Sequence, residues 1–195
     1  MTALRYPFDE QQVRSLKAGD AVSITGLVYT GRDKFHKYFA DGGKPPVDFR
    51  DGALYHCGPV VVRDRGAGGG DWRVVAAGPT TSVRENPYEP SFIAKSGVRL
   101  VIGKGGMDAA TLAAMKKHGC VYIQAVGGAA ALSAAAVRRV AGVSFLDEFG
   151  AAEAVWHLEV EGFTGIVAMD ARGCSLFEKV AEASSAEFRR LTSAP

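Results

Sequence analysis

The sequence predicts a single α/β domain, residues 1–195, in which a mixed β-sheet is flanked by helices. Three observations favour this fold class. With 195 residues, 47% of them hydrophobic, the chain can bury one substantial core. Residues 21–30 (AVSITGLVYT) are apolar and β-branched, as is typical of a buried strand. After residue 98, short apolar runs alternate with helical runs, and crossover helices of this length imply parallel strands.

Turn residues divide the first half of the chain into short elements. Residues 1–18 are expected to be an approach segment to the strand at 21–30. Gly31 then marks a strand-to-helix turn, because aromatic residues follow it at helical spacing. The glycines and prolines of residues 42–52 predict a loop. Three short strands are expected after it, at 53–58, 59–63 and 71–78, with a hairpin turn at RGAGGGD (65–71) between the last two.

Helices dominate the expectations for the second half. One helix is expected to begin near Pro90 and to end at Gly97, since proline suits a first turn and glycine a C-terminal cap. The alanine-rich run AALSAAAVRRVAG (130–142) predicts another helix by its propensity. The other expected elements are strands at 98–105 and 120–128, a helix at 107–119, an antiparallel pair at 154–163 and 164–173 separated by Thr164 and Gly165, and a final amphipathic helix at 175–191, with residues 178–195 assigned to the C-terminal helical segment.

Charge and cysteine content narrow the classes of partner. A net charge of +2, from 23 basic and 21 acidic residues, is too balanced to suggest a nucleic-acid partner. The three cysteines are widely separated and lack CxxC spacing, so neither a disulfide framework nor a metal site is expected in this chain. There is no apolar run of about 18 residues. We therefore expect no membrane partner, reduced thiols and a cytoplasmic location.

Three cations follow apolar β runs: Arg32, Arg84 and Lys104. In open α/β sheets ligands gather outside the carboxyl ends of strands, so these side chains are expected to converge. Arginine binds a carboxylate through two parallel hydrogen bonds, and lysine adds a compact charge. Three such cations match a small dianion. Lys104 lies between two glycines, which leaves packing little reason to select it.

For the two arginines a surface ion pair is the competing interpretation. Arg32 could pair with Asp33, and Arg84 with Glu85 or Glu89. The motif around Lys104 is not a nucleotide-triphosphate loop, because GxxxxGK[ST] is absent.

Other polar and small residues could complete the site. The Thr80 and Thr81 hydroxyls could orient ligand or exchange a proton, or they could simply cap a turn. The Gly127–Gly128 pair precedes an expected helix, whose N-terminus would favour an anion. His36, four residues beyond Arg32, is a candidate acid or base together with Asp33, although a histidine on a helix surface is the commoner outcome.

Six blocks in order resemble the β subunit of class I, iron-sulfur-dependent fumarate hydratases and L-tartrate dehydratases. The resemblance runs from about Gly19 to Phe177, and it is carried by TGRDKFHKYF, GPTTSVRENPY, VRLVIGKGGM, VYIQAVGGAAAL, LDEFGAAEAVWHLEVEGF and TGIVAMDARGCSL. It implies a swivelling β/β/α domain that supplies half of an active site. The other half would be an α subunit or an N-terminal domain, whose three cysteines hold a [4Fe-4S] cluster with one open iron. The resemblance also suggests a heterotetramer of two α and two β subunits with a homodimer contact.

The same resemblance implies roles for residues. Arg32, Arg84 and Lys104 would bind substrate carboxylates, and Thr80 would be the base, while the open iron would act as the Lewis acid. The GGAAAL run favours fumarate and malate over tartrate, whereas Gly106 after GKG fits either substrate. 

Two further features of the resemblance bear on function. Glu85 stands where relatives often carry methionine, and an inward-pointing acid there could weaken the grip of Arg84. The alternatives to a fumarase β subunit are an L-tartrate dehydratase β subunit and a stand-alone dicarboxylate-binding domain.

Overall fold

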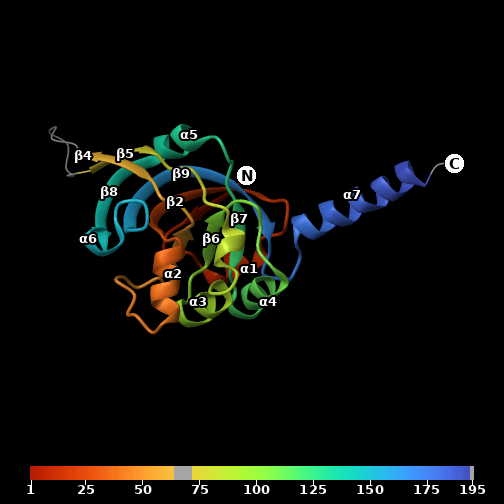
Figure 1. The fold of residues 1–195 in the computed structure, drawn as a ribbon, viewed down its shortest axis with the longest axis horizontal. Helices are drawn as coiled ribbons and strands as arrows, with labels where there is room; N and C mark the ends of the chain where they lie inside the picture. Colours follow the sequence, from red (N-terminus) through yellow and green to blue (C-terminus); the bar gives the residue numbers. More distant parts are fainter. Residues whose placement is uncertain (64–71, 194–195) are drawn as a thin grey trace.

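A mixed seven-stranded sheet forms the body of the protein (Figure 1). The computed structural model describes residues 1–63 and 72–193. The strands are β1 (Thr2–Arg5), β2 (Ala21–Thr30), β3 (Ala53–Tyr55), β4 (Val60–Arg63), β5 (Trp72–Ala76), β6 (Leu100–Gly103), β7 (Val121–Gln124), β8 (Val137–Ser144) and β9 (Val155–Met169). The helices are α1 (Glu10–Ser15), α2 (Asp33–Ala40), the 3-10 helix η1 (Ser82–Glu85), α3 (Glu89–Ser96), α4 (Ala109–His118), α5 (Ala130–Ala135), α6 (Leu146–Phe149) and α7 (Leu176–Thr192).

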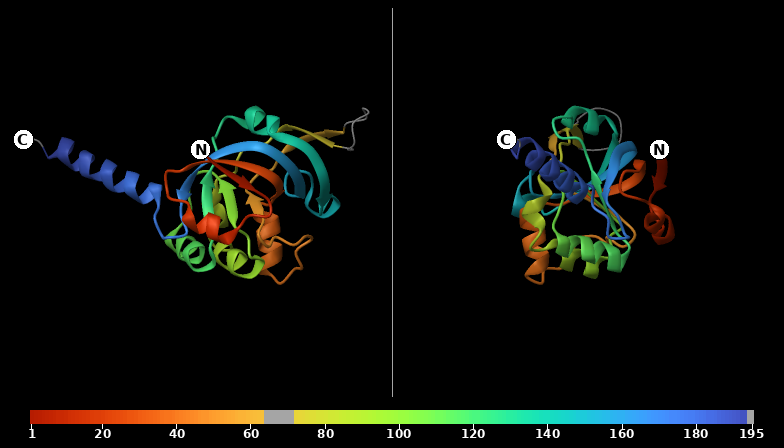
Figure 2. Two further views of the ribbon diagram at one scale, coloured as in Figure 1. Left: turned by 180° about the vertical axis from the view of Figure 1, so that it is seen from behind. Right: turned by 90° about the vertical axis from the view of Figure 1, so that its right-hand side faces the viewer.

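The sheet closes on itself. Its strand order is β1-β2-β3-β6-β7-β9-β8, and β2 also pairs with β9. Strands β2, β3, β6 and β7 run parallel, whereas β9 is antiparallel to its partners. The prediction of parallel pairing through crossover helices is confirmed for β6 and β7, which α4 connects, but not for the strand expected after the second helix, because β9 is antiparallel to β7. The curved β9 wraps across the other strands, with α2, α3 and α4 on one side of the body (Figure 2).

Side chains that alternate between the two faces of the strands divide the core into two buried clusters. Leu100 and Ile102 on β6 belong to a buried cluster with Trp156 of β9, while Val101 belongs to a second buried cluster with Phe35 and Phe92 of the helices. Successive side chains of a strand point to opposite faces, so a central strand buried on both faces must be apolar throughout. This explains why the predicted strands read as continuous apolar runs.

The helix predicted at 130–142 is half wrong. Helix α5 ends at Ala135, and β8 begins at Val137 and pairs antiparallel with β9. Valines 137, 140 and 143 suit a pleated strand, and pairing along β9 outweighs the helix propensity of the alanines.

The antiparallel pair predicted at 154–173 is also wrong, because one continuous strand, β9, spans Val155–Met169. Its halves have different neighbours: β8 pairs with the first half, β7 with the second, and β2 along both. Thr164 and Gly165 pair with β2 instead of forming a turn. A Cβ built on Gly165 would lie only 2.4 Å from Ile123 Cγ2, so the glycine is needed for close strand packing.

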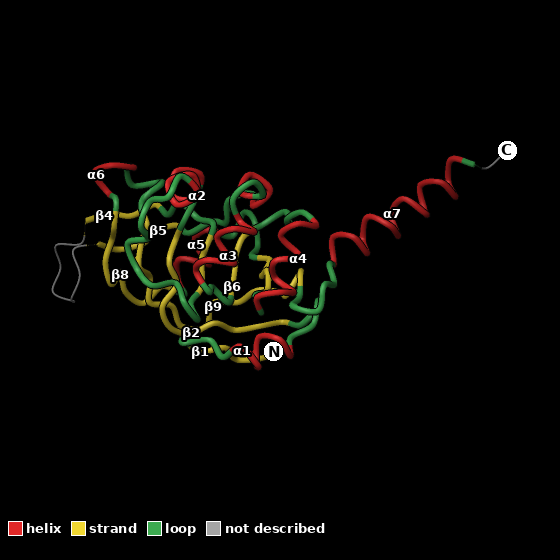
Figure 3. The backbone as a smooth tube through the Cα atoms, turned by 90° about the horizontal axis from the view of Figure 1, so that it is seen from below, coloured by secondary structure: helices red, strands yellow, loops and turns green. Residues whose placement is uncertain are grey.

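The ends of the chain carry more structure than predicted. The expected approach segment contains β1, which pairs parallel with β2, and α1, which is capped by Asp9. The predicted C-terminal helix is confirmed as α7, which leaves the body and buries none of its residues (Figure 3). Residues 194–195 and the predicted hairpin turn at 65–71 lie outside the described residues, although β4 and β5 on either side of that turn do pair antiparallel. Among the described helices, none has the length and apolar character needed to cross a membrane.

Candidate active site

Three predicted site segments meet at one edge of the sheet. Arg32 follows β2 and Lys104 follows β6, and these strands flank β3 in the parallel part of the sheet. Between them, Thr80 N donates to His56 O at 2.6 Å, and Lys104 N donates to Thr80 O at 3.3 Å. The two motifs GPTT and GKG are therefore hydrogen-bonded neighbours, although GPTT follows β5, which lies outside the seven-stranded sheet.

Lys104 lies close to other predicted residues. Thr81 and Lys104 form an isolated parallel bridge, and a Cβ built on Gly127 would lie 3.5 Å from Lys104 Cδ. Gly128 adopts φ +82 and faces open space. Because α5 has only six residues and begins at Ala130, its dipole adds little, and the glycine pair matters chiefly by leaving room beside Lys104.

The Arg32 side chain binds a main-chain carbonyl and a carboxylate. Its Nη1 donates to Ala152 O at 3.1 Å and lies 3.2 Å from Glu153 Oε1, so the competing pair with Asp33 is wrong. Its Nε is buried without a hydrogen-bond partner among the described residues. A Cβ on Gly58 would lie 2.7 Å from Nη1, so this glycine leaves space for the guanidinium.

Arg84 is exposed and forms an ion pair with Asp33 at the start of α2. The competing interpretation of an ion pair is therefore right, but its predicted partners are wrong, because Glu85 and Glu89 are both fully buried. Since Asp33 adjoins Arg32, this ion pair brings the Arg84 guanidinium to the same end of α2 as Arg32.

A buried polar cluster lies beneath these segments. His36 is 1% exposed, which corrects the expectation of a histidine on a helix surface, and His56 was not singled out by the sequence. His36 Nε2 lies 2.9 Å and His56 Nε2 3.2 Å from the same oxygen, Glu89 Oε2. Glu85 Oε2 lies 3.3 Å from His36 Nδ1, so the Glu85 carboxylate points inward to His36. The position of His56 directly after a buried strand was the one signal for it.

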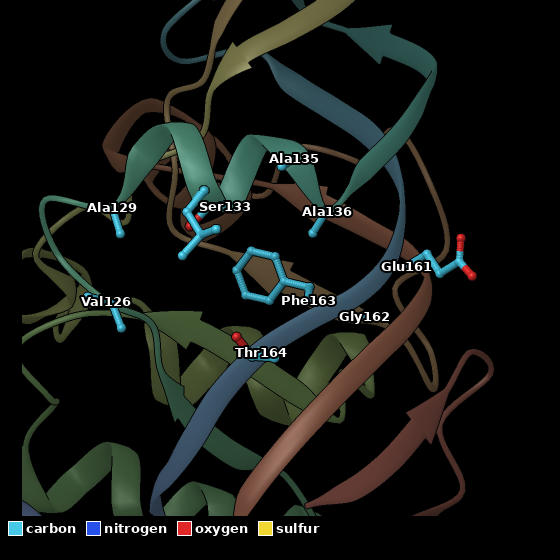
Figure 4. A pocket seen from close by; sticks show the side chains of 10 residues that line it. Val126, Ala129, Ser133, Ala135, Ala136, Glu161, Gly162, Phe163 and Thr164 are labelled. Atoms are coloured by element: carbon cyan, nitrogen blue, oxygen red, sulfur yellow. The ribbon is translucent and has the colours of Figure 1, made fainter.

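A cavity of about 340 Å³ opens beside the glycine pair (Figure 4). Its walls come from α5 and β9, including Ala129, Ser133 and Phe163, and Val126 lines it next to Gly127. The lining is largely apolar and carries one carboxylate, Glu161, so it does not resemble an anion site.

Comparison with known proteins decides the family. The sequence profile of the family described as fumarase C-terminus matches residues 2–180. This chain belongs to the fumarase C-terminus family. The predicted resemblance is thereby confirmed over nearly the whole chain.

Relatives of this fumarase C-terminus chain have two kinds of name. A Geobacillus stearothermophilus protein provisionally named fumarate hydratase class I is 50% identical over 93% of this chain, which covers 34% of that protein. A Methanocaldococcus jannaschii protein provisionally named L(+)-tartrate dehydratase subunit beta is 40% identical, over 91% of this chain and 93% of its own length. The Escherichia coli K12 L(+)-tartrate dehydratase subunit beta is 33% identical, over 89% and 85%. The chain thus spans about a third of one relative and nearly the whole of the others.

In this fumarase C-terminus chain, burial and the nearby histidines shift the pKa values of Glu85 and Glu89 in opposite directions. Burial raises the pKa of Glu85 to about 7, and the neighbouring Asp33 carboxylate acts in the same direction against the lowering effect of His36. Burial would also raise the pKa of Glu89, but His36 and His56 outweigh it and hold that pKa below its ordinary value. The site therefore contains one firmly ionised buried carboxylate and one that gains a proton near neutral pH.

Replacing Glu85 by glutamine is expected to stabilise the protein at alkaline pH. Because the folded-state pKa of Glu85 lies above the unfolded value, the stability that its protonated form contributes is present at low pH and lost as pH rises from 4.5 through about 7. At pH 8 the gain in unfolding free energy should reach up to about 3 kcal/mol, at about 1.4 kcal/mol per pKa unit. Urea unfolding at pH 8 and pH 5 measures it. An equal gain at both pH values would contradict the assignment.

The cysteines do not fit an iron-sulfur cluster. Cys57 and Cys120 are buried, and burial raises the pKa of Cys57 to about 12, while Cys174 is exposed. In the part of the chain that the structure describes, the one group of possible metal ligands is His36, His56 and Glu89, without a cysteine. Hydrogen bonds already engage all four ring nitrogens of those histidines.

Proposed function

We propose that this chain is the β subunit of a hydro-lyase that reversibly hydrates fumarate to L-malate. The observation that carries the proposal is the hydrogen-bonded contact between the GPTT and GKG segments beside the end of β2, in a chain of the fumarase C-terminus family. This contact supports a site in which cations from separate segments act together, as binding of a dicarboxylate requires.

In this proposal Arg32, Arg84 and Lys104 bind the substrate carboxylates and stabilise the negative charge that develops during proton transfer at carbon. The buried Nε of Arg32, which has no hydrogen-bond partner in residues 1–63 and 72–193, supports a ligand contact there, because buried donors are normally satisfied. Thr80 would move the proton. Thr81, Gly127 and Gly128 would line the substrate next to Lys104, while His36 and Asp33 remain candidate acid or base groups.

The site is incomplete, so a partner is part of the proposal. We propose an α subunit that carries the [4Fe-4S] cluster, because no cysteine of the described chain joins a ligand group. The assembly would hold two α and two β subunits with a homodimer contact, and the domain would swivel against its partner. Exposed apolar residues on the protruding α7, Val180, Phe188 and Leu191, are available for such contacts. We also propose a cytoplasmic location, because the thiols of Cys57 and Cys120 are free and buried, and reduced thiols are typical of cytoplasmic proteins.

L-tartrate is the second candidate substrate. The relatives of matching length are named as tartrate dehydratase β subunits, whereas the relative with 50% identity is named as a fumarate hydratase. The GGAAAL run favours fumarate. A stand-alone dicarboxylate-binding domain without catalysis is the third possibility, and it requires that no cluster-bearing partner exists.

A substrate panel on the complex with the α subunit separates these possibilities. Fumarate and malate are expected to give the highest kcat/KM, ahead of L-tartrate and mesaconate, each assayed anaerobically at the same enzyme concentration. A higher kcat/KM for L-tartrate than for malate would assign the chain to tartrate dehydration. Dicarboxylate binding without turnover of any member would favour the stand-alone domain.

A further inference from the structure

A continuous chain of buried side chains runs beneath the strand ends of the candidate site. We call it the Glu89 network: His36, His56, Ser82, Glu89 and Tyr122. Beyond the two histidine contacts to Glu89, His56 Nδ1 lies 2.9 Å from Ser82 Oγ, and Ser82 Oγ lies 2.9 Å from the Tyr122 hydroxyl. Each member is at most 1% exposed. The network therefore links α2, the end of β3, η1, α3 and β7.

Two members of the network hold the main chain of predicted site residues. His36 Nδ1 donates to Arg32 O at 3.0 Å, so the ring fixes the residue that precedes α2. The carbonyl of His56 accepts the hydrogen bond from Thr80 N at 2.6 Å. Rotation of the His36 ring would break its contact with the Arg32 carbonyl, whereas His56 holds Thr80 through its main chain and Glu89 through its ring.

A third member reaches the lysine. Ser82 N donates to Lys104 O at 2.9 Å, while the Ser82 hydroxyl belongs to the network. Gly103 makes room for this arrangement, because a Cβ there would lie 2.0 Å from Ser82 Oγ and 3.0 Å from the Tyr122 hydroxyl. The glycine before Lys104 thus has a second reason to be there besides access of a ligand.

The hydrogen-bond partners fix the protons. His36 Nδ1 faces a carbonyl oxygen and Nε2 faces a carboxylate, and both of these oxygens accept only, so both ring nitrogens must carry a proton. His56 differs, because Nε2 donates to Glu89 and Nδ1 can accept from the Ser82 hydroxyl. The network then contains one imidazolium, one neutral imidazole and one carboxylate.

We infer that Glu89 is a positioning residue of this site, and that it acts through a His36 imidazolium and a neutral His56 to orient the segments that bear Arg32, Thr80 and Lys104. The catalytic consequence rests on the proposed function, whereas the proton arrangement does not. Charge-assisted hydrogen bonds in a buried network lock their partners into one geometry. Such support matters because a displacement of about 1 Å in a site can cost about 100-fold in rate.

The groups that face His36 support its charge. They are the Arg32 carbonyl before α2, Glu85 of η1 and Glu89 of α3, while the neutral His56 ring packs beside them with its centroid 5.2 Å away. Burial alone would lower the pKa of His36, but Glu89 and Glu85 raise it above its ordinary value. Burial lowers the pKa of His56 despite the attraction of Glu89.

The first test needs only the isolated wild-type chain. Long-range ¹H–¹⁵N spectra of the four histidine rings at pH 7.5, assigned with His36→Gln and His56→Gln, report which nitrogens carry protons. We expect His36 to be doubly protonated and His56 to be neutral with its proton on Nε2. Finding His36 neutral at pH 7.5, or finding the His56 proton on Nδ1, would overturn the inference.

The second test asks whether the network positions the site. Glu89→Gln is expected to make His36 neutral at pH 7.5 and to shift the amide resonances of Arg32, Thr80 and Lys104. In the complex with the α subunit it should lower kcat by about 10- to 100-fold. Glu148→Gln, which changes an exposed acid on α6, is the matched control and should change none of these. 

The outcomes remain separable. Unchanged site amides and wild-type kcat in folded Glu89→Gln would overturn positioning. If the wild-type complex turns over none of the substrates in the panel, the proposed function fails. The spectra of the histidine rings and the amide shifts still test whether Glu89 positions the site. Glu89→Asp, which keeps the charge, should recover the doubly protonated His36 and part of kcat. Should Glu89→Gln not fold, the shorter side chain of Glu89→Asp tests positioning instead: shifted amides of Arg32, Thr80 and Lys104 with a lowered kcat are then expected, and wild-type values of both would overturn it.

Discussion

Lys104→Ala is expected to lower kcat/KM of the complex with the α subunit by about 100- to 1,000-fold. The substitution removes a charge-assisted contact to a carboxylate that is desolvated in the closed site, and losing one such stabilising donor typically costs about 3 to 4 kcal/mol. Steady-state kinetics of fumarate hydration measure the loss. Because Lys104 contributes its main chain to Ser82, the backbone contact survives in the alanine variant.

Two comparisons sharpen the lysine experiment. Lys95→Ala removes an exposed lysine of α3 and should leave kcat/KM within about twofold, as surface substitutions usually do. Arg84→Ala is expected to act in the same direction as Lys104→Ala, and it also frees Asp33 from its ion pair. Wild-type kinetics for Lys104→Ala would remove this residue from the proposed carboxylate-binding set.

The isolated chain is expected to show no hydratase activity, and activity should appear when an α subunit with an intact cluster is added under anaerobic conditions. The reason is that the described residues supply cations and hydroxyls but no cysteine in a metal-ligand group. The conversion of fumarate followed by its ultraviolet absorbance, with and without the α subunit, measures the difference. Turnover by the chain alone would contradict the half-site proposal.

A control distinguishes a missing partner from a misfolded chain. The isolated chain should unfold cooperatively in urea, as expected for a domain with two well-packed buried clusters. The α subunit alone should also be inactive. Activity in the α subunit without this chain would show that the cations at the ends of β2 and β6 are dispensable.

The local sequence pattern was enough to predict the parts of the site that lie at strand ends. The strand at Ala21–Thr30 and the turn into α2 follow from composition and turn chemistry, and they put Arg32 at the edge of the sheet. Lys104 follows from the same reasoning at the end of β6. Ends of parallel strands in one sheet lie at the same edge, so the placement of Arg32 and Lys104 at one edge could be predicted. GPTT follows β5, which lies in the separate two-stranded sheet, so its contact with GKG does not follow from this argument.

Long-range pairing explains what the sequence could not predict. Glu89 binds His36 and His56 across 53 and 33 residues, and each of these residues, taken alone, resembles a solvent-exposed polar position. β8 became a strand because β9 offers it a partner, which local propensity cannot register. Arg84 found Asp33 instead of its sequence neighbours because burial directs Glu85 and Glu89 inward.

The shared use of β9 constrains how this protein can vary in length. A single inserted or deleted residue in Val155–Met169 would shift its register against β2, β7 and β8 together and would turn its buried side chains toward solvent. Insertions should instead be tolerated between α2 and β3 near residues 44–46, which lie outside the helices and strands, whereas Phe49 and Gly52 later in the loop are anchored by the core and by Leu100 N. Homologues are therefore expected to keep the length of β9 while differing in that loop.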